Sequence, residues 1–335
     1  MLKGAIIGFG KIAQEHHINA FESDKLKNKI SITAAVEKDD LNRKISGEKY
    51  PYLKFYKSID ELFQNEKLDF IDITVPPNLH YEMLKKGIAN NVHIICEKPF
   101  TMKLSEAGEI KSMLEASQIC FMPCHQYKYL PIWQRFKKFV EGNKSKKVIA
   151  KFEIVRTEAD SGLKLLDNRW RIKKEISGGG ITSDTGVHYL YLTNWLLGEP
   201  KNITSRMFNL THTNYEVEDT TAIIGEFENG VAEVMLTWAG NKRFNSASLT
   251  SSLGAIHYGG GNEAIISTNN DEEIISIPDP SSKASYLELY IKMIEDFIEQ
   301  INSGPNRQYV EEAYNSIKLL SMCYQSAETK TSVEW

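Results

Sequence analysis

Short apolar runs alternate with helical patterns over the first 124 residues, and this alternation restricts the possible folds more than any other feature of the sequence. The apolar runs, most of them rich in isoleucine and valine, are Leu2–Ile7, Ile30–Val36, Phe70–Val75, Val92–Cys96 and Ile119–Met122. The segments between them with apolar residues at helical spacing are Ile12–Phe21, Ile59–Phe63, Tyr81–Ala89 and Leu104–Ala116. Strands that alternate with helices form βαβ units, so we expect a parallel sheet with right-handed crossovers.

The pattern changes after residue 124, where strand-like runs follow one another without helices between them. These runs are Asn202–Leu210, Thr220–Phe227, Val231–Trp238 and Ser246–Ser251. Consecutive strands of this kind are typical of an antiparallel sheet. The sequence therefore predicts an α/β protein with two domains. Residues 1–124 form a Rossmann domain with a doubly wound parallel sheet, and residues 125–335 form an α+β domain with a large, mainly antiparallel, open-faced sheet for substrate binding and oligomerisation.

Composition excludes several classes of protein. The 335 residues carry 40 Lys+Arg and 44 Asp+Glu, a net charge of −4, and 41% are hydrophobic, which is typical of a globular chain rather than a disordered one. No apolar run approaches the roughly 20 residues of a membrane span, and none resembles a signal peptide. The near-neutral charge does not favour nucleic-acid or membrane partners. Four cysteines do not form a disulfide framework in a chain of this length. We therefore expect a cytoplasmic enzyme.

A glycine motif between the first strand and the first helix predicts a dinucleotide site. The stretch Gly8–Ala13 reads Gly-Phe-Gly-Lys-Ile-Ala, a G-x-G-x-x-A pattern. Gly8 would make the tight turn, Gly10 would let the backbone approach a pyrophosphate, and the helix N-terminus would offer free N–H groups. The alternative is a purely structural turn. The residues expected at the cofactor in this motif are Gly8, Phe9, Gly10, Lys11 and Ile12.

An acidic residue, Glu37, ends the second predicted strand. A carboxylate at this place accepts hydrogen bonds from the adenosine ribose and repels a 2′-phosphate, so NAD is favoured over NADP. The neighbouring Lys38 could neutralise a 2′-phosphate, so NADP stays open as the less favoured cofactor.

Two further groups of polar residues suit chemistry at a bound ligand. Lys98 follows the fourth apolar run directly, and ligands of parallel sheets lie beyond the carboxyl ends of the strands. Pro99 fixes the backbone next to it, which favours a positioned lysine over a solvated one. The glycine run Gly178–Gly180 opens a helix on which Asp184 and His188, four residues apart, share one face.

These motifs together resemble the Gfo/Idh/MocA oxidoreductases, the family of glucose–fructose oxidoreductase and inositol dehydrogenase. The resemblance lies in Gly8–Gly10, in Glu97–Pro99 and in Gly178–His188, and it continues in Thr74–His80 and Phe227–Gly230. It implies reversible, NAD(P)-dependent oxidation of a secondary alcohol on a sugar, cyclitol or sugar nucleotide. Where the family has Asn-x-Arg-Phe, this chain reads Gln-Tyr-Lys-Tyr from residue 126, which leaves the substrate open.

The candidate site residues follow from the resemblance together with the chemistry. His188 is the expected general base, Lys98 would stabilise the alkoxide, and Asp184 would orient one of them or bind an adjacent hydroxyl. Further cofactor contacts are expected from Thr74, Pro76, Asn78, His80, Glu97, Lys98 and Gln126. Substrate contacts are expected from Lys98, Lys128, Trp170, Arg171, Asp184 and His188.

Several alternatives stay open at this point. Asp184 could cap its helix while His188 packs in the core. The protein could be a non-catalytic NAD-responsive sensor, or a glycosidase that uses tightly bound NAD in a transient oxidation. We expect no metal, since Cys120, Cys124 and His125 suit buried free residues better than ligands. His16 and His17 suit structural positions or the neighbourhood of the pyrophosphate. We expect a homodimer or homotetramer formed through the C-terminal sheet.

Overall fold

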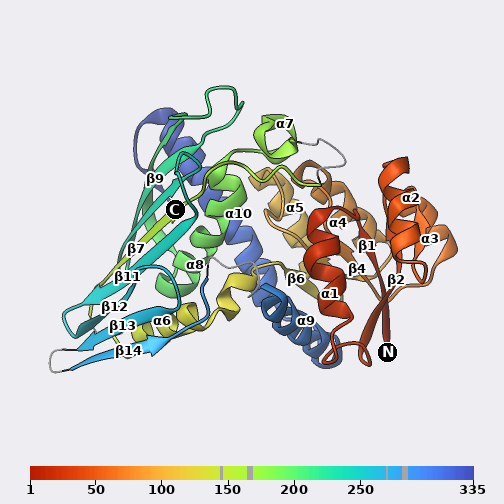
Figure 1. Ribbon diagram of the computed structural model, residues 1–335, viewed down its shortest axis with the longest axis horizontal. Coiled ribbons are helices and arrows are strands. Elements are labelled where there is room, and N and C mark those ends of the chain that lie inside the picture. Colours follow the sequence, from red (N-terminus) through yellow and green to blue (C-terminus); the bar gives the residue numbers. More distant parts are fainter. Residues whose placement is uncertain (144–145, 164–168, 269–270, 281–285) are drawn as a thin grey trace. The chain divides into compact units, whose positions relative to one another are not determined.

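The fold is described from a computed structural model that covers residues 1–335 except 144–145, 164–168, 269–270 and 281–285 (Figure 1). The chain forms two compact units. The first unit comprises Met1–His125, Ser161–Trp170 and Tyr286–Tyr314. The second unit comprises the ranges Gln126–Asp160, Arg171–Ser285 and Asn315–Trp335.

The first unit is built on a six-stranded parallel sheet with the order β3-β2-β1-β4-β5-β6. Its strands are β1 (Leu2–Ile7), β2 (Ile30–Val36), β3 (Lys54–Tyr56), β4 (Phe70–Ile73), β5 (His93–Cys96) and β6 (Phe121–Pro123). In register, Ile7 pairs with both Val36 and Ile73, and Ile73 pairs with Cys96, so these four strands end at one edge. The predicted parallel sheet is confirmed. Strand β3 was not predicted, because its three residues are exposed or half-exposed and form no apolar run in the sequence.

Helices surround this sheet in the first unit. They are the π-helical turn η1 (Ala13–His17), α1 (Ile18–Phe21), α2 (Asp40–Lys49), α3 (Ile59–Asn65), η2 (Pro77–Leu79), α4 (His80–Ala89), α5 (Leu104–Glu115), α9 (Tyr286–Ser303) and the start of α10 (Arg307–Thr329). Side-chain caps begin two of them: Asp39 accepts from the Asn42 N–H at 2.8 Å, and Ser58 accepts from the Glu61 N–H at 3.2 Å.

Helix α9 groups with the first unit, whereas the sequence assigned it to residues 125–335. The physical reason is its apolar face, on which Tyr290, Ile294 and Phe297 are buried. This face packs against η1, α1 and β6. A helical period shows which face of a helix is apolar, but it does not show which domain that face covers.

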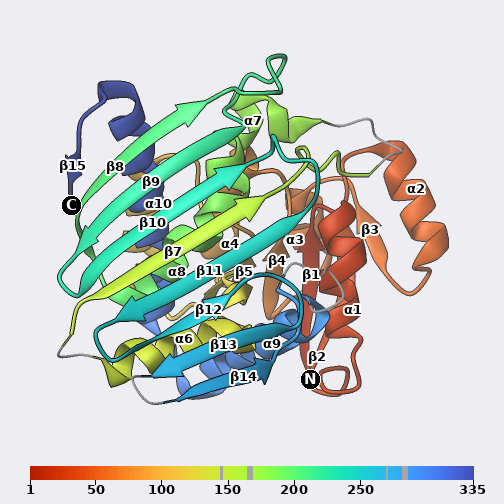
Figure 2. The same cartoon turned by 60° about the vertical axis from the view of Figure 1, so that its left-hand side comes forward.

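The second unit contains a nine-stranded sheet in the order β14-β13-β12-β11-β7-β10-β9-β8-β15 (Figure 2). Its strands are β7 (Val148–Val155), β8 (Pro200–Phe208), β9 (Thr220–Phe227), β10 (Gly230–Thr237), β11 (Phe244–Ser251), β12 (Gly254–Tyr258), β13 (Glu263–Thr268), β14 (Glu272–Ser276) and β15 (Val333–Glu334). Strand β10 pairs parallel with β7 and antiparallel with β9, and the other pairings between described strands of this sheet are antiparallel. The predicted mainly antiparallel sheet is therefore confirmed.

One face of this sheet is buried and the other is open. Burial alternates along β7 and β10, as expected for strands with one covered face. The helices α6 (Pro131–Gly142) and α8 (Val187–Leu197) cover the buried face (Figures 1 and 2). On this face Trp133 packs against Phe152. Shorter helical segments in this unit are η3 (Gln126–Tyr129), α7 (Lys174–Ser177) and the π-helical turn η6 (Thr182–Gly186), while η5 (Trp170–Ile172) begins at the last residue of the first unit's middle segment. Among the described helices, none is long and apolar enough to cross a membrane.

Candidate active site

The predicted site residues fall in both units, and each set is described within its own unit. The glycine motif lies where β1 ends and η1 begins. Gly8 has φ +94°, and a Cβ there would come within 2.7 Å of Val75 Cγ1. Apart from its neighbours along the chain, no atom of the described residues lies within 4 Å of a Cβ built on Gly10, so the backbone there has room for a ligand. Both features fit the approach of a dinucleotide pyrophosphate to this turn.

Phe9, between these glycines, points into the protein. Its ring lies edge-on to Tyr50 and Phe55, with ring centroids 5.2 Å apart in both cases. Its carbonyl oxygen accepts a hydrogen bond from Asn42 Nδ2 at 3.0 Å. The side chain therefore anchors the turn, and only its backbone is placed to serve a cofactor.

Glu37 is held at the end of β2 by two hydrogen bonds. Its carboxylate accepts from the Asp39 N–H at 2.9 Å and from Asn42 Nδ2 at 2.7 Å. The side chain is buried, while the neighbouring Lys38 is exposed. Because Asn42 also bonds to Phe9, the acidic residue is tied to the glycine turn. A carboxylate in this fixed position suits the ribose role that the sequence predicted.

The residues that follow β4, from Thr74 to His80, connect the ends of neighbouring strands through hydrogen bonds. Thr74 Oγ1 donates to the Gly8 carbonyl oxygen at 2.6 Å. The His80 ring nitrogens lie 2.7 Å from the Pro99 oxygen and 2.8 Å from the Val75 oxygen, and burial lowers the pKa of His80. His80 is fully buried, so its described contacts serve the loop. Pro76 is half-buried and Asn78 is exposed. Contacts of these residues with a cofactor stay a prediction.

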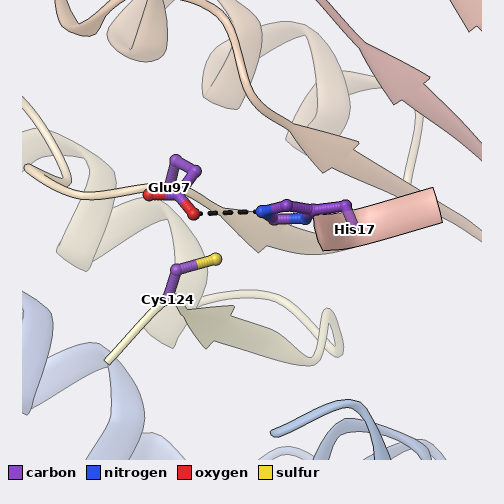
Figure 3. A group of neighbouring side chains, drawn as sticks. All are labelled: His17, Glu97 and Cys124. Atoms are coloured by element: carbon purple, nitrogen blue, oxygen red, sulfur yellow. Dashed lines mark hydrogen bonds and ion pairs between the residues drawn. The ribbon is translucent and has the colours of Figure 1, made fainter. Parts of the chain in front are cut away.

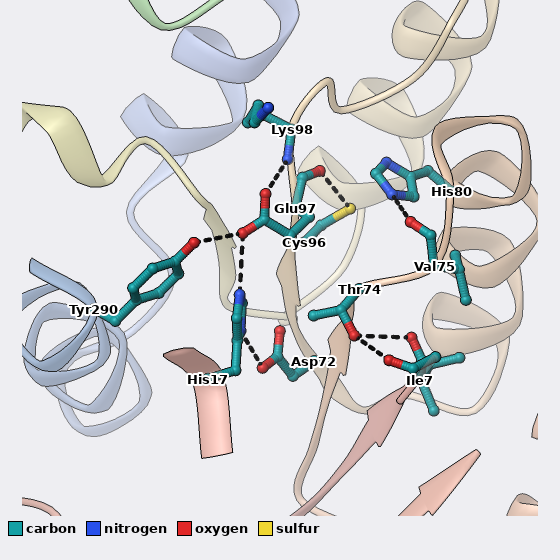
Figure 4. Close-up of polar contacts among 11 residues, drawn as sticks. Ile7, His17, Asp72, Thr74, Val75, His80, Cys96, Glu97, Lys98 and Tyr290 are labelled. Carbon is teal, nitrogen blue, oxygen red and sulfur yellow. Dashed lines mark hydrogen bonds and ion pairs between the residues drawn. The ribbon is translucent and has the colours of Figure 1, made fainter. Parts of the chain in front are cut away.

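Lys98 is half-buried and follows β5 at the carboxyl edge of the sheet, as predicted. The carboxylate of the preceding Glu97 is engaged inside the protein (Figures 3 and 4). Glu97 Oε1 lies 3.0 Å from His17 Nε2 and accepts from the Tyr290 hydroxyl at 2.8 Å, while Oε2 accepts from the Lys98 N–H at 3.2 Å. The described contacts of Glu97 support the backbone of Lys98, and the contact of Glu97 with a cofactor stays a prediction.

The network continues from His17 to a buried acid, Asp72. His17 Nδ1 lies 2.7 Å from Asp72 Oδ2, and both side chains are fully buried (Figure 4). Burial works against charge on His17, but the carboxylates of Asp72 and Glu97 outweigh it and raise the pKa of His17 to about 10. Burial raises the pKa of Asp72, whereas His17 and Lys98 outweigh burial at Glu97 and lower the pKa of Glu97. Sequence reasoning did not assign this network, although an acid within the apolar strand β4 signals a buried partner.

Cys124 lies beside His17 and Glu97 (Figure 3). The nitrogen, oxygen and sulfur atoms of these three side chains that could bind a metal ion lie within 4.8 Å of one another. A metal ion needs a neutral imidazole and a thiolate. The raised pKa of His17 favours the imidazolium, and burial raises the pKa of the Cys124 thiol well above its usual value. These three side chains therefore suit a protonated His17 better than a bound metal ion.

In the second unit, a buried glutamate fixes the loop that leads to Asp184. The Glu218 carboxylate accepts from the Gly180 N–H at 3.0 Å, the Thr182 N–H at 3.1 Å and the Tyr324 hydroxyl at 2.8 Å. A Cβ on Gly180 would overlap the Glu218 carbonyl oxygen, so only glycine permits this close approach. Glu218 was not predicted, since its sequence neighbourhood offers no signal for this role.

Asp184 pairs with Arg171, another predicted substrate residue. Arg171 Nε donates to Asp184 Oδ1 at 3.1 Å, and Arg171 also bonds to the Asp160 carbonyl oxygen at 3.3 Å. Asp184 lies inside the π-helical turn η6, whose N-cap is Ile181 with no side-chain cap. The alternative that Asp184 caps the helix is therefore wrong. The ion pair fixes the carboxylate and leaves it 19% exposed.

His188 is held by two tyrosines. Its ring stacks on Tyr127 with centroids 4.0 Å apart and planes 9° apart, and its Nδ1 lies 3.0 Å from the Tyr191 hydroxyl. The same hydroxyl accepts from the Tyr127 N–H at 3.0 Å. His188 is 5% exposed, so its ring orientation is fixed by packing and hydrogen bonding. Sequence reasoning placed Tyr127 in a variant motif but gave neither tyrosine a role.

The remaining predicted residues lie near these elements. Gln126 and Lys128 are buried in η3, and the Lys128 carbonyl oxygen accepts from Gln134 Nε2 at 2.6 Å. Trp170 is half-buried at the start of η5. Their contacts with a cofactor or substrate stay a prediction.

Residues 2–125 match the sequence profile of an oxidoreductase family with an NAD-binding Rossmann fold, GFO_IDH_MocA. Residues 147–257 match the profile of the C-terminal domain of the same family. The chain belongs to the GFO/IDH/MocA family. The predicted family, fold class and cofactor are confirmed: it is an NAD-binding oxidoreductase, and the open turn at Gly8 and Gly10 fits that cofactor.

Relatives within the GFO/IDH/MocA family include named sugar dehydrogenases. D-glucoside 3-dehydrogenase of Escherichia coli is 24% identical over 351 residues, which cover 99% of this chain and 97% of the relative. D-apiose dehydrogenase of Rhizobium rhizogenes is 26% identical over 234 residues, covering 70% of this chain and 65% of the relative. A levoglucosan dehydrogenase solved with NADH and levoglucosan has the same fold, with a TM-score of 0.85, 17% identity and 99% of each chain covered.

Proposed function

We propose that this GFO/IDH/MocA protein is an NAD-dependent dehydrogenase that oxidises a secondary alcohol of a sugar, cyclitol or sugar nucleotide. The observation that carries the proposal is the presence of Lys98, Asp184 and His188. Side-chain contacts hold Asp184 on η6 and His188 on α8, and the backbone N–H of Lys98 is held just after β5. The relatives named for D-glucosides and D-apiose support a carbohydrate substrate. Bound NAD would supply the hydride acceptor.

In this proposal His188 accepts the proton of the substrate hydroxyl, and Lys98 balances the negative charge that forms on the oxygen. Oxidation of a carbinol removes the hydroxyl proton together with a hydride. His188 takes the proton, because imidazole titrates near neutral pH, and Nε2 is the nitrogen we assign to it since Nδ1 faces Tyr191. Lys98 stabilises the alkoxide by its charge. Asp184, held by Arg171, accepts a hydrogen bond from an adjacent substrate hydroxyl.

The proposal is tested with purified protein, NAD and a panel of aldoses, glycosides, cyclitols and sugar nucleotides. We expect an increase in reduced-nicotinamide absorbance with at least one class. Glycoside cleavage without net NADH would instead favour the redox glycosidase. Tight NAD binding with neither reaction over the whole panel would favour the sensor, which shares the fold but needs no turnover.

Tyr191→Phe tests how His188 is held. An imidazolium donates a charge-assisted hydrogen bond to the Tyr191 oxygen, and this bond is stronger than that of the neutral ring. Its loss should reduce kcat by about tenfold across the kcat–pH profile, because the ring is no longer held in place. Tyr258→Phe, which changes a phenol beside Asp279 in the same unit, is the control. A profile that superimposes on that of the wild type would contradict the role of Tyr191.

Glu37→Ala tests the choice of NAD over NADP. Removing the carboxylate removes a ribose acceptor and a repulsive charge, so the ratio of kcat/KM for NAD to that for NADP should fall at least about tenfold, or about 1.4 kcal/mol. The matched control is Glu48→Ala, which removes an exposed carboxylate on α2 of the same unit. An unchanged ratio in Glu37→Ala would assign the preference to other residues.

We also propose that two copies associate through the open face of the C-terminal sheet. Exposed apolar side chains on this face are Ile149, Ile224, Val231 and Met235. Ile149 and Val231 are register partners on β7 and β10, and Lys151 pairs with Glu233 at 3.4 Å beside them. A face that carries both apolar groups and both signs of charge is suited to a self-complementary contact.

The mass of the particle in solution tests this association. The wild type should form a dimer or tetramer in light scattering, and Ile149→Glu with Val231→Glu should shift it to the monomer, because the carboxylates would be desolvated at the contact. Leu41→Glu is the matched control, since Leu41 is 52% exposed but lies on α2 of the other unit. A monomeric wild type, or an oligomer that survives the double substitution, would contradict the proposed contact.

A further inference from the structure

We propose that His17 is a positioning residue for Lys98, acting through the Glu97 carboxylate. The inference rests on the proposed function, because it needs Lys98 to act at the reacting atoms. All of its residues lie in the first unit, and Figure 4 shows the chain of contacts from Asp72 through His17 and Glu97 to Lys98.

Glu97 and His17 together connect four separate elements. Its carboxylate contacts His17 from η1 and Tyr290 from α9, and it accepts the N–H of Lys98 after β5. His17 in turn contacts Asp72 in the middle of β4. The helix that follows the glycine turn is therefore connected to the residue that follows β5, over 80 positions of sequence.

The charge on His17 makes this connection strong. Asp72 and Glu97 are two buried acids, and a buried carboxylate needs a cation or several hydrogen bonds. His17 lies between them and faces both, at 2.7 Å and 3.0 Å. Among the described residues, the other titratable groups facing the cluster are Lys98, whose charge helps to lower the pKa of Glu97, and Cys96, Cys124 and Tyr290. Burial raises the pKa of each of the last three well above its usual value. The side chains of Cys96, Cys124 and Tyr290 stay neutral near neutral pH. His17 is therefore the positive charge that lies between the Asp72 and Glu97 carboxylates.

Loss of His17 would also affect Lys98, because Glu97 contacts both residues. If Glu97 lost the Nε2 donor and the positive charge, its carboxylate would turn toward other donors or take up a proton. The Lys98 N–H would then lose its 3.2 Å acceptor, and the backbone that carries the ammonium group would shift. Displacing a catalytic group by about 1 Å can cost a factor of about 10² in rate.

A double-mutant cycle between His17→Gln and Lys98→Ala tests the inference. His17→Gln alone should lower kcat by about 10- to 100-fold and leave the dissociation constant of NAD within about threefold, because the glycine turn itself is unchanged. In the Lys98→Ala background the same substitution should lower kcat by less than about threefold, since the residue it acts through is gone. An equal loss in both backgrounds would show that His17 does not act through Lys98.

Two further variants keep the test decisive. His16→Gln is the matched control, because it removes the neighbouring histidine that stacks on the same Tyr290 ring, and kcat should stay within about threefold. If His17→Gln does not fold, Glu97→Gln replaces it in the cycle and should show the same loss only when Lys98 is present. If the panel shows no turnover at all, the proposed function fails. Turnover with an additive cycle defeats this inference alone.

Metal analysis of the purified wild type distinguishes the proton from an ion. We expect no stoichiometric transition metal and unchanged kcat after treatment with a chelator. One equivalent of zinc that is lost in Cys124→Ser would overturn the proton assignment, since Cys124 is the third member of the ligand-type group.

Discussion

His188→Ala is expected to lower kcat by a factor of about 10² to 10⁴, the usual range for loss of a general base. The dissociation constant of NAD should stay within about threefold, because the substitution leaves the glycine turn unchanged. The loss follows from the proton that must leave the substrate hydroxyl along with the hydride. A single-turnover measurement at saturating NAD and substrate reports this step directly.

His212→Ala is the control for this variant. His212 is also stacked on a tyrosine in the second unit, at 4.5 Å from the Tyr215 ring, but its Nε2 faces the carbonyl oxygens of Thr157 and Trp238. Its loss should leave the chemical step nearly unchanged. Near-normal turnover in His188→Ala on the true substrate would defeat the assignment of the base.

Lys98→Met is expected to lower kcat by about 10² to 10³, since it removes the charge that stabilises the alkoxide while keeping a side chain of similar length. Lys98→Arg should recover at most about tenfold of this loss, because the planar guanidinium cannot replace a compact ammonium group at a fixed position. The measurement is kcat and KM for NAD and for substrate in all three proteins.

The control for the lysine is Lys103→Met, which removes a lysine whose side chain is 68% exposed and paired with Glu106. It should have no effect on kcat. If Lys98→Met raised KM with kcat unchanged, Lys98 would contribute only to uniform binding, and the alkoxide role would be wrong.

The periodicity and the glycine motif predicted most of the fold, because both depend on neighbours in sequence. Strands such as β1 and β4 are continuous apolar runs, and Gly8–Ala13 lies at the predicted strand–helix junction. Strand β3 and the grouping of α9 with the first unit were not predictable in this way. Each depends on which surface a short or amphipathic segment covers, and no local pattern encodes that choice.

The sequence predicted which residues belong to the candidate site more completely than it predicted the contacts between them. Lys98, Asp184 and His188 were found because their motifs are local. The groups that hold them are distant in sequence: Glu97 contacts His17 over 80 positions, and Glu218 contacts Gly180 over 38. Arg171 and Asp184 were both predicted to bind substrate, and the structure pairs them with each other. Such partners become visible only when the buried charges are matched in space.

The central claim is direct hydride transfer from a substrate carbinol to NAD, and isotope transfer tests it most directly. The substrate found in the panel is labelled with deuterium at the carbon that is oxidised, and the reduced nicotinamide is analysed by mass spectrometry. We predict one deuterium in each reduced cofactor formed by the wild type, with the same label and a much lower rate in His188→Ala. A reduced cofactor without deuterium, or product formed while NAD stays oxidised throughout, would contradict the account.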